Sequence, residues 1–270
     1  MIAEAEDLLY PGKRPAAQVG ILAPRSSYVW DTVSEFGELA SLENMTEHAS
    51  DYGAEVYGLY LALNVHANIQ VDMLDEDMAS TQEALSPLKL LIITEPNVPV
   101  ETMDAVGQWV RRGGTLMTTS GAAKADRLND PRKFLENLSG IAEEPRPRLN
   151  INYETSKYCC CPPCPDGGSA NSAGGEAGGG AGSSWPVAAR GTMHWPEPAK
   201  VDGPFDAIGI RSKTSPITTT TPLGTFADGS TAVQRVGVGK GSAIHWNFLP
   251  GLSCKGDAFL MILCSRLPSR

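Results

Sequence analysis

The apolar run LKLLIIT at residues 88–94 constrains the fold of this chain more than any other feature. A strand that is apolar on both sides must be covered on both faces, as strands of parallel sheets are. The run VGILA at 19–23 has the same character and ends at Pro24. The two runs therefore predict neighbouring buried strands in a sheet with helices on both faces.

Helical and strand-like segments alternate around these two runs. Apolar spacing predicts helices over 51–67 and 100–112 and further strands over 69–74 and 115–119. Asn68 follows the first helix and suits a left-handed stop, and Gly113-Gly114 is predicted to end the second. Residues 25–50 are predicted to form a polar connection. Two strand–helix–strand crossovers in one hundred residues indicate an α/β fold with a doubly wound, mostly parallel sheet.

The second half of the chain carries hairpin signals. Asp228-Gly229 lies between β-prone flanks, and Gly239-Lys240-Gly241 separates the predicted strands 233–238 and 242–248. Residues 256–263 are predicted to form a closing helix. The sheet is therefore expected to gain antiparallel C-terminal hairpin strands.

Residues 159–184 consist mainly of Cys, Pro, Gly, Ser and Ala. Such a segment cannot bury enough apolar surface to offset the entropy lost on ordering. It is predicted to be a disordered insertion in a surface loop. The domain prediction is thus a single α/β domain spanning residues 1–270 with this insertion.

Composition excludes several classes of function. The 270 residues carry a net charge of −9, which disfavours a nucleic-acid backbone as partner. No stretch reaches the roughly 20 apolar residues that a membrane-spanning helix needs. The acidic start MIAEAED has no signal-peptide pattern, and the six cysteines lack the spacing of a disulfide-stapled domain. A cytoplasmic location is the expectation, without membrane or nucleic-acid partners.

The cysteine cluster is the first candidate for chemistry. Cys161 and Cys164 have the C-x-x-C spacing of metal and redox sites. A structural zinc site needs four ligands, and only Cys254, Cys264 and His194 are available to complete one. The surrounding prolines also disagree with a redox motif at a helix start. An unstructured tract is the preferred interpretation, and no cofactor or metal is expected.

Ser120 is the second candidate, because it follows the predicted strand 115–119. Hydrolases with α/β folds expose a nucleophile on such a turn, although Thr118 and Ala122 replace the usual flanking glycines here. His245 is a possible base, and Asp228 or Asp257 a possible orienting acid. The alternative is an ordinary polar turn, with no catalytic residue in the chain.

A third candidate is a ligand site at the strand ends, where open α/β sheets bind small molecules. Arg25, Glu95, Asn97 and Ser120 follow predicted strands and are its candidate ligand-binding residues. The acidic residues 75–77 follow another strand, and their simpler interpretation is a solvated loop. In that interpretation Glu95 accepts hydrogen bonds from the backbone or from Arg25. The glycine-rich segment 237–241 lacks a phosphate-loop ending and is interpreted as a hairpin turn.

Several motifs in order resemble a known family. They are VYGLYLAL at 56–63, IQVD at 69–72, LLIITEP at 90–96, WVRRGGTL at 109–116 and GVGKG at 237–241. This order is similar to the trimerisation domain of family 42 glycoside hydrolase β-galactosidases, over roughly residues 18–127 and 225–251. The resemblance implies a flavodoxin-like fold related to class I glutamine amidotransferases, with Ser120 at the nucleophile turn and no cysteine nearby.

The resemblance also implies a function. In the β-galactosidases the catalytic glutamates belong to a separate barrel, which needs about 200 residues or more, and no segment here is long enough for one. The leading hypothesis is a non-catalytic module that supports oligomerisation or assembly of a glycoside hydrolase in carbohydrate metabolism. Its expected partners are further copies of the chain or a glycoside hydrolase barrel. Within a larger protein, the expected activity is that of a β-galactosidase. The alternatives are a small Ser/His hydrolase or amidase, and a sugar- or nucleotide-binding module at the strand ends.

Overall fold

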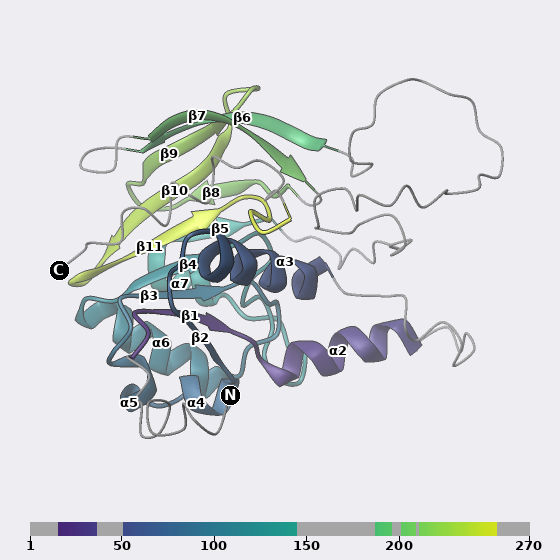
Figure 1. The fold of residues 1–270 in the computed structure, drawn as a ribbon, viewed down its shortest axis with the longest axis vertical. Helices are drawn as coiled ribbons and strands as arrows, with labels where there is room; N and C mark the ends of the chain where they lie inside the picture. The colour runs from purple at the N-terminus through teal and green to yellow at the C-terminus, as the bar shows by residue number, and fades with distance from the viewer. Residues whose placement is uncertain (1–15, 37–50, 145–186, 196–200, 209–210, 253–270) are drawn as a thin grey trace, which may run out of the picture.

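The structure, a computed structural model, describes residues 16–36, 51–144, 187–195, 201–208 and 211–252. A nine-stranded sheet runs through these residues in the order β2-β1-β3-β4-β11-β10-β9-β6-β7 (Figure 1). Strands β2, β1, β3, β4 and β11 are mutually parallel, and the other four extend the sheet in antiparallel fashion. A separate two-stranded sheet joins β5 and β8. The molecule therefore has an α/β fold with a mixed sheet.

The strand bounds follow the sheet order. The parallel strands are β2 (Val71–Leu74), β1 (Val19–Leu22), β3 (Leu90–Ile93), β4 (Thr115–Thr118) and β11 (Gly241–Trp246). The antiparallel strands are β10 (Thr231–Val238), β9 (Thr221–Phe226), β6 (Val187–Trp195) and β7 (Val201–Ile208). The small sheet consists of β5 (Ile141–Glu143) and β8 (Thr214–Pro216).

Helices pack on both sides of the parallel strands (Figure 1). On one face lie α4 (Glu76–Ala79), α5 (Gln82–Leu85), α6 (Val100–Arg112) and α7 (Phe134–Ser139). The other face is covered by α3 (Asp51–Tyr60), which continues into the π-helix η3 (Leu61–His66). Helix α2 (Arg25–Phe36) follows β1 and extends from the carboxyl ends of the strands.

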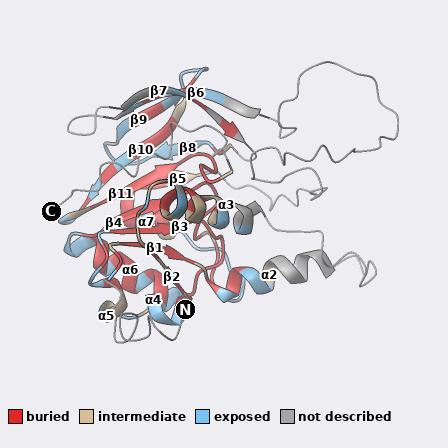
Figure 2. Ribbon diagram, in the orientation of Figure 1, coloured by how far each residue is buried: buried red, intermediate tan, exposed pale blue. Residues whose placement is uncertain are grey.

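The alternation of side chains along β3 explains why its sequence is apolar throughout. Leu91 and Ile93 enter the core beneath α5, α6 and α7, whereas Leu90 and Ile92 enter the core beneath α3 and η3. All four residues are buried (Figure 2). The prediction that this strand is covered on both faces is confirmed.

Helix α6 was predicted over the same residues that form it, Val100–Arg112. Its inward stripe of Met103, Val106 and Val110 is buried. Gly113 ends the helix with a φ of +130°, and Asn68, which follows η3, has a φ of +54°. The predicted ends of both helices are therefore confirmed, and both residues have a positive φ, which Gly and Asn tolerate better than other residue types do.

The predicted polar connection over 25–50 is wrong in its first part, because residues 25–36 form helix α2. The helix begins directly after Pro24, and a free N–H of its first turn bonds to a residue far away in the chain: the Ser26 N–H donates to the carboxylate of Glu76, the first residue of α4, at 2.9 Å. A free N–H at a helix start needs such a partner. No local sequence pattern reveals a partner that lies on a distant helix.

Both predicted hairpins are present. Gly229 turns the chain between β9 and β10, and Gly239 turns it between β10 and β11, with φ of +80° and +61°. The second hairpin also touches the end of α6, since the Lys240 N–H donates to the Arg111 carbonyl at 3.0 Å and the Ser242 N–H to the Gly114 carbonyl at 3.2 Å. These contacts hold the β10–β11 hairpin against the end of α6 and the residue before β4.

The antiparallel part has an aromatic core. The Phe205 and Phe248 rings stack at 4.9 Å, and Trp246 meets Phe248 edge to face at 5.4 Å. Phe226 completes the group, with the Arg211 guanidinium 4.1 Å above its ring. Strands β6 and β7, whose residues 193 and 205 join this core, were not predicted from the sequence.

Two predictions cannot be compared with the structure. The predicted insertion at 159–184 and the predicted closing helix at 256–263 lie outside the described residues. Among the helices of the described ranges, none is both long and apolar enough to cross a membrane.

Candidate functional site

The candidate residues gather at the carboxyl ends of the parallel strands. Arg25 follows β1, Glu95 and Asn97 follow β3, and Ser120 follows β4, while His245 lies near the end of β11. Because these strands are parallel, their carboxyl ends share one edge of the sheet, as the sequence predicted. The edge is largely closed: of these five residues, only Arg25 is exposed.

Ser120 lies in a tight turn directly after β4 and is 1% exposed. Its hydroxyl donates to Oε1 of Glu143 at 3.1 Å. The next residue, Gly121, donates its N–H to both oxygens of the same carboxylate, at 3.0 and 3.2 Å. Lys124 Nζ lies 3.3 Å from Glu143 Oε2. The predicted nucleophile is therefore hydrogen-bonded to an acidic side chain from β5.

His245 lies beside Thr118, its register partner on the neighbouring parallel strand. Its Nδ1 and the Thr118 hydroxyl are 2.9 Å apart. Burial lowers the pKa of His245 to about 4, an effect that the nearby Glu143 carboxylate only partly offsets. The Nε2 atom has no hydrogen-bond partner among the residues that the structure describes, and the nearby Asn247 side chain raises the pKa only slightly. The imidazole is therefore neutral at physiological pH.

The Ser120 hydroxyl thus bonds to Glu143 and the His245 imidazole to Thr118, so the hydrogen bonds given for these two side chains do not join them to each other. A serine nucleophile needs a base that accepts its proton, and the Ser120 hydroxyl donates to Glu143. Of the two predicted orienting acids, Asp228 pairs with Arg211 at 2.6 Å, and Asp257 lies outside the described residues. The arrangement is a buried polar network with one neutral imidazole and one ion pair.

Asn97, in the loop after β3, bonds both to the first turn of helix α2 and to the loop that contains Asp126 and Asn129. Its backbone N–H donates to the Ser27 hydroxyl at 2.8 Å, and that hydroxyl donates back to the Asn97 carbonyl at 2.9 Å. Its side-chain Nδ2 donates to the Asp126 carbonyl at 3.0 Å and to Asn129 Oδ1 at 2.9 Å. The residue that was predicted to bind a ligand therefore holds helix α2 and a neighbouring loop of the chain together.

Replacing Asn97 with alanine is expected to lower the free energy of unfolding by about 1–3 kcal/mol, because the buried Asp126 carbonyl loses its donor. Asn137, which is exposed on α7, provides the matched control, and its replacement with alanine is expected to change stability by less than about 0.5 kcal/mol. Urea unfolding of both variants measures the difference. Equal stability of the two variants would contradict the role given to Asn97.

The acidic loop after β2 is only partly solvated. Arg25 forms an ion pair with Asp77, and both side chains are well exposed. Glu76 is buried instead, at 6% exposure, and caps helix α2. The interpretation of residues 75–77 as a solvated loop is therefore wrong in two respects: Glu76 and Asp77 begin helix α4, and Glu76 is buried. Glu95 is also buried, and its backbone carbonyl accepts the Ala123 N–H at 2.8 Å.

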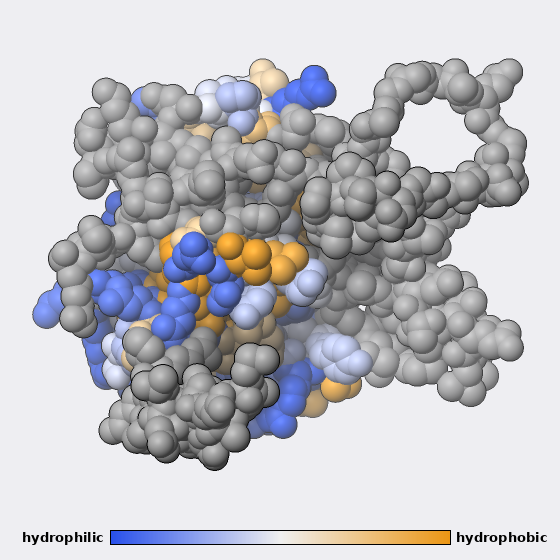
Figure 3. Space-filling model, viewed as in Figure 1, coloured by the Kyte–Doolittle hydropathy of each residue, from blue (hydrophilic) through white to orange (hydrophobic). Residues whose placement is uncertain are grey.

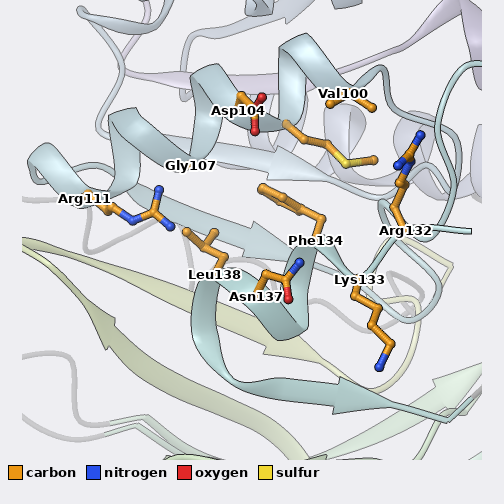
Figure 4. A pocket seen from close by; sticks show the side chains of 10 residues that line it. Val100, Asp104, Gly107, Arg111, Arg132, Lys133, Phe134, Asn137 and Leu138 are labelled. Carbon is orange, nitrogen blue, oxygen red and sulfur yellow. The ribbon is translucent and has the colours of Figure 1, made fainter.

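A cavity of about 250 Å³ lies between α6 and α7 (Figure 4). Its apolar wall includes Met103, Phe134 and Leu138. Arg132 and Lys133 line it too, but each is paired with a carboxylate of the chain: Arg132 with Asp126 and Lys133 with Glu136. The predicted strand-end crevice contributes none of the residues that line this cavity.

Metal binding has no support among the described residues, where no group of three or more His, Cys, Asp or Glu side chains has the arrangement of a metal site. Cys161 and Cys164 lie outside the described residues. Sequence reasoning overlooked Glu143 and Lys124. Both are contributed by segments without a motif, so no local signal identifies them.

No protein-family model matches the chain, and no curated protein sequence is significantly similar to it. Solved structures share its fold. A cold-adapted β-galactosidase from Rahnella sp. R3 aligns with a TM-score of 0.61 at 17% identity, over 98% of this chain and 33% of its own. A β-galactosidase from Bacillus circulans sp. alkalophilus aligns with a TM-score of 0.59 at 19% identity, over 92% of this chain and 30% of its own.

A third similar structure is the exo-β-1,4-mannosidase from Opitutaceae bacterium strain TAV5, with a TM-score of 0.54 at 14% identity. It matches all of this chain and 38% of its own length. The chain thus spans about a third of the length of the glycoside hydrolases that it matches. At these identities the likeness establishes the fold.

Proposed function

We propose that the chain is a non-catalytic module that supports oligomerisation or assembly of a glycoside hydrolase, comparable to the trimerisation domain of family 42 β-galactosidases. Its fold in this proposal is flavodoxin-like and of the glutamine amidotransferase type. Its partners are further copies of itself or the barrel of a glycoside hydrolase. Within a larger protein, the accompanying activity is that of a β-galactosidase in carbohydrate metabolism.

One observation carries this proposal: almost the whole chain aligns with about a third of several β-galactosidase chains. A segment that matches one part of larger enzymes is expected to act as one of their domains. The closed strand-end edge supports a non-catalytic role, because Ser120, Asn97 and His245 are buried and bonded to the chain itself.

A module of this kind needs a surface for its partner, and α3 with η3 offers one. Tyr57, Leu61 and Val65 follow each other at intervals of four along this helix. Tyr57 is 60% and Val65 57% exposed. Figure 3 shows hydrophobic side chains at the surface where α3 faces the viewer, bordered by hydrophilic ones. Exposed apolar stripes of this kind commonly mark protein–protein contacts. We name Tyr57, Leu61 and Val65 the α3 stripe.

The solution mass of the purified chain tests the proposal, measured by light scattering with and without a chromogenic galactoside. We expect a multiple of the 28.7 kDa chain mass and no turnover of the galactoside. The double variant Tyr57→Glu/Val65→Glu is expected to weaken association at least about tenfold, because charges placed in an interface must be desolvated. The control is Ile217→Glu, at a residue that is 68% exposed outside the stripe. A monomer that hydrolyses the galactoside would overturn the proposal.

Neither alternative function is favoured by a specific observation. A Ser120–His245 hydrolase requires a hydrogen bond between the two side chains, and they bond instead to Glu143 and Thr118. A sugar- or nucleotide-binding module requires an open crevice at the strand ends, where Asn97 and Ser120 are buried. Calorimetric titration with galactosides and nucleotides tests the second alternative directly.

A further inference from the structure

The Glu143 carboxylate is held like a bound anion. Its side chain is 4% exposed, and three kinds of donor converge on it: the Gly121 N–H, the Ser120 hydroxyl and the Lys124 ammonium. The four distances lie between 3.0 and 3.3 Å. Backbone N–H groups, hydroxyls and ammonium groups are the donors with which proteins recognise carboxylates.

The backbone of the turn is shaped for this contact. Gly121 has a φ of +86° and Ala123 a φ of +50°, so the turn departs from the ordinary right-handed conformation twice. The backbone N–H groups on either side donate to other acceptors. The Ser120 N–H donates to the Phe248 carbonyl, and the Ala122 N–H donates to the Thr119 carbonyl. The Gly121 N–H alone of these three is directed at the carboxylate.

We propose that the turn formed by residues 119–124 is a carboxylate-binding site, that Glu143 fills it in the closed chain, and that a small external monocarboxylate binds there when the Glu143 side chain is withdrawn. The ligand class follows from the donors. One backbone N–H bonds both carboxylate oxygens, a hydroxyl bonds one of them, and an ammonium neutralises the charge. A halide offers no second oxygen, and a primary amide offers one acceptor and no charge.

The occupant also connects two parts of the fold. Glu143 is the last residue of β5, which pairs with β8 in the small sheet. Its bonds to the turn after β4 therefore fasten the small sheet to the carboxyl edge of the large one. An external carboxylate that binds to the same donors therefore competes with the Glu143 side chain for them. This proposal is independent of the oligomerisation proposed above. The outcome of the rescue experiment below does not predict the solution mass, and the solution mass does not predict the outcome of the rescue.

Chemical rescue tests the site. Glu143→Ala removes one methylene and the carboxylate, which together correspond to acetate. We expect the variant to melt about 5 °C lower than the unchanged protein, because buried donors lose their acceptor. Sodium acetate at about 100 mM is expected to recover about half of this loss, because a ligand that binds only the folded state stabilises it. Sodium chloride at equal ionic strength and acetamide are expected to recover none.

Two further variants serve as controls for the rescue of Glu143→Ala by acetate. Glu143→Gln still fills the site by shape, so acetate is expected to leave its melting temperature unchanged. Glu144→Ala alters the exposed neighbouring side chain and is expected to show neither the loss nor the rescue. If acetate, acetamide and chloride shift Glu143→Ala equally, or if acetate also rescues Glu143→Gln, the proposal is wrong.

A second measurement covers the case in which Glu143→Ala does not fold. The amide proton resonance of Gly121 reports its bond to the carboxylate in the unchanged protein. We expect this resonance to move upfield in Glu143→Gln, because a neutral amide oxygen is a weaker acceptor than a carboxylate. An unchanged Gly121 resonance would overturn the assignment of this turn as a carboxylate site.

Discussion

Alanine in place of Gly241 is expected to lower the free energy of unfolding by on the order of 3 kcal/mol or more. A Cβ atom at this position would lie 2.2 Å from each of two backbone carbonyl oxygens, those of Gly114 and Val110. Both atoms belong to the end of α6 and the start of the next strand, so neither can rotate away as a side chain can. The variant must therefore separate β11 from α6.

Gly237 provides the matched control for this experiment. It lies in β10, the other strand of the same hairpin, and a Cβ atom there would have no neighbour within 4 Å. Gly237→Ala is expected to change stability by less than about 0.5 kcal/mol. Urea unfolding followed by circular dichroism compares the two variants. A similar loss in both would show that the contact between Gly241 and α6 is not the cause.

Glu55 is expected to make the stability of the protein fall as the pH rises from about 4.5 to about 8. Its side chain is fully buried on α3, and burial raises its pKa from 4.5 to about 8 against the lowering effect of backbone N–H groups at Gly251 and Leu252. Oε2 accepts the Leu252 N–H at 2.8 Å, whereas Oε1 has no hydrogen-bond partner among the described residues. The folded chain therefore keeps the carboxyl group protonated at neutral pH.

The direction of this pH dependence follows from the number of protons that the folded and unfolded states bind. Between pH 4.5 and 8 the folded state holds a proton that the unfolded state releases, so each rise in pH favours unfolding. Below pH 4.5 both states are protonated and the effect is absent. Above pH 8 the full loss is reached, on the order of 5 kcal/mol.

Glu55→Gln isolates this effect, because glutamine has nearly the same shape and does not titrate. The variant and the unchanged protein are expected to be similarly stable at pH 4, and the variant more stable by several kcal/mol at pH 9. Glu83→Gln, at an exposed residue of α5, controls for the loss of one carboxylate from the surface. Urea unfolding across this pH range measures the difference. A difference between Glu55→Gln and the unchanged protein that does not vary with pH would refute the role of Glu55.

Local patterns predicted the parts of the fold that local interactions determine. The apolar run at 88–94 predicted a strand buried on both faces, because alternate side chains of β3 enter the two cores on opposite faces of the sheet. Asn68 and Gly113 marked helix ends, because a positive φ favours these residue types. The two glycine turns predicted hairpins for the same reason.

Distant partners explain what the sequence could not reveal. Helix α2 depends on Glu76, which is fifty residues away from Ser26. The partner of Ser120 is set by the pairing of β5 with β8, and that of His245 by the parallel pairing of β4 with β11. Each of these contacts exists only in the folded sheet. Residue type and spacing identified Ser120 and His245 as candidates. The residues that surround them, however, are brought there only by the tertiary structure.

The place of β11 between β4 and β10 has a consequence for synthesis on the ribosome. Thr118 and His245 are register partners that lie 127 positions apart in the chain. The nascent N-terminal half therefore emerges with the hydrogen-bonding groups of β4 open until the last strand arrives. An open edge of this kind recruits other chains and favours aggregation. Truncation before residue 231, which removes the β10–β11 hairpin, leaves that edge permanently bare.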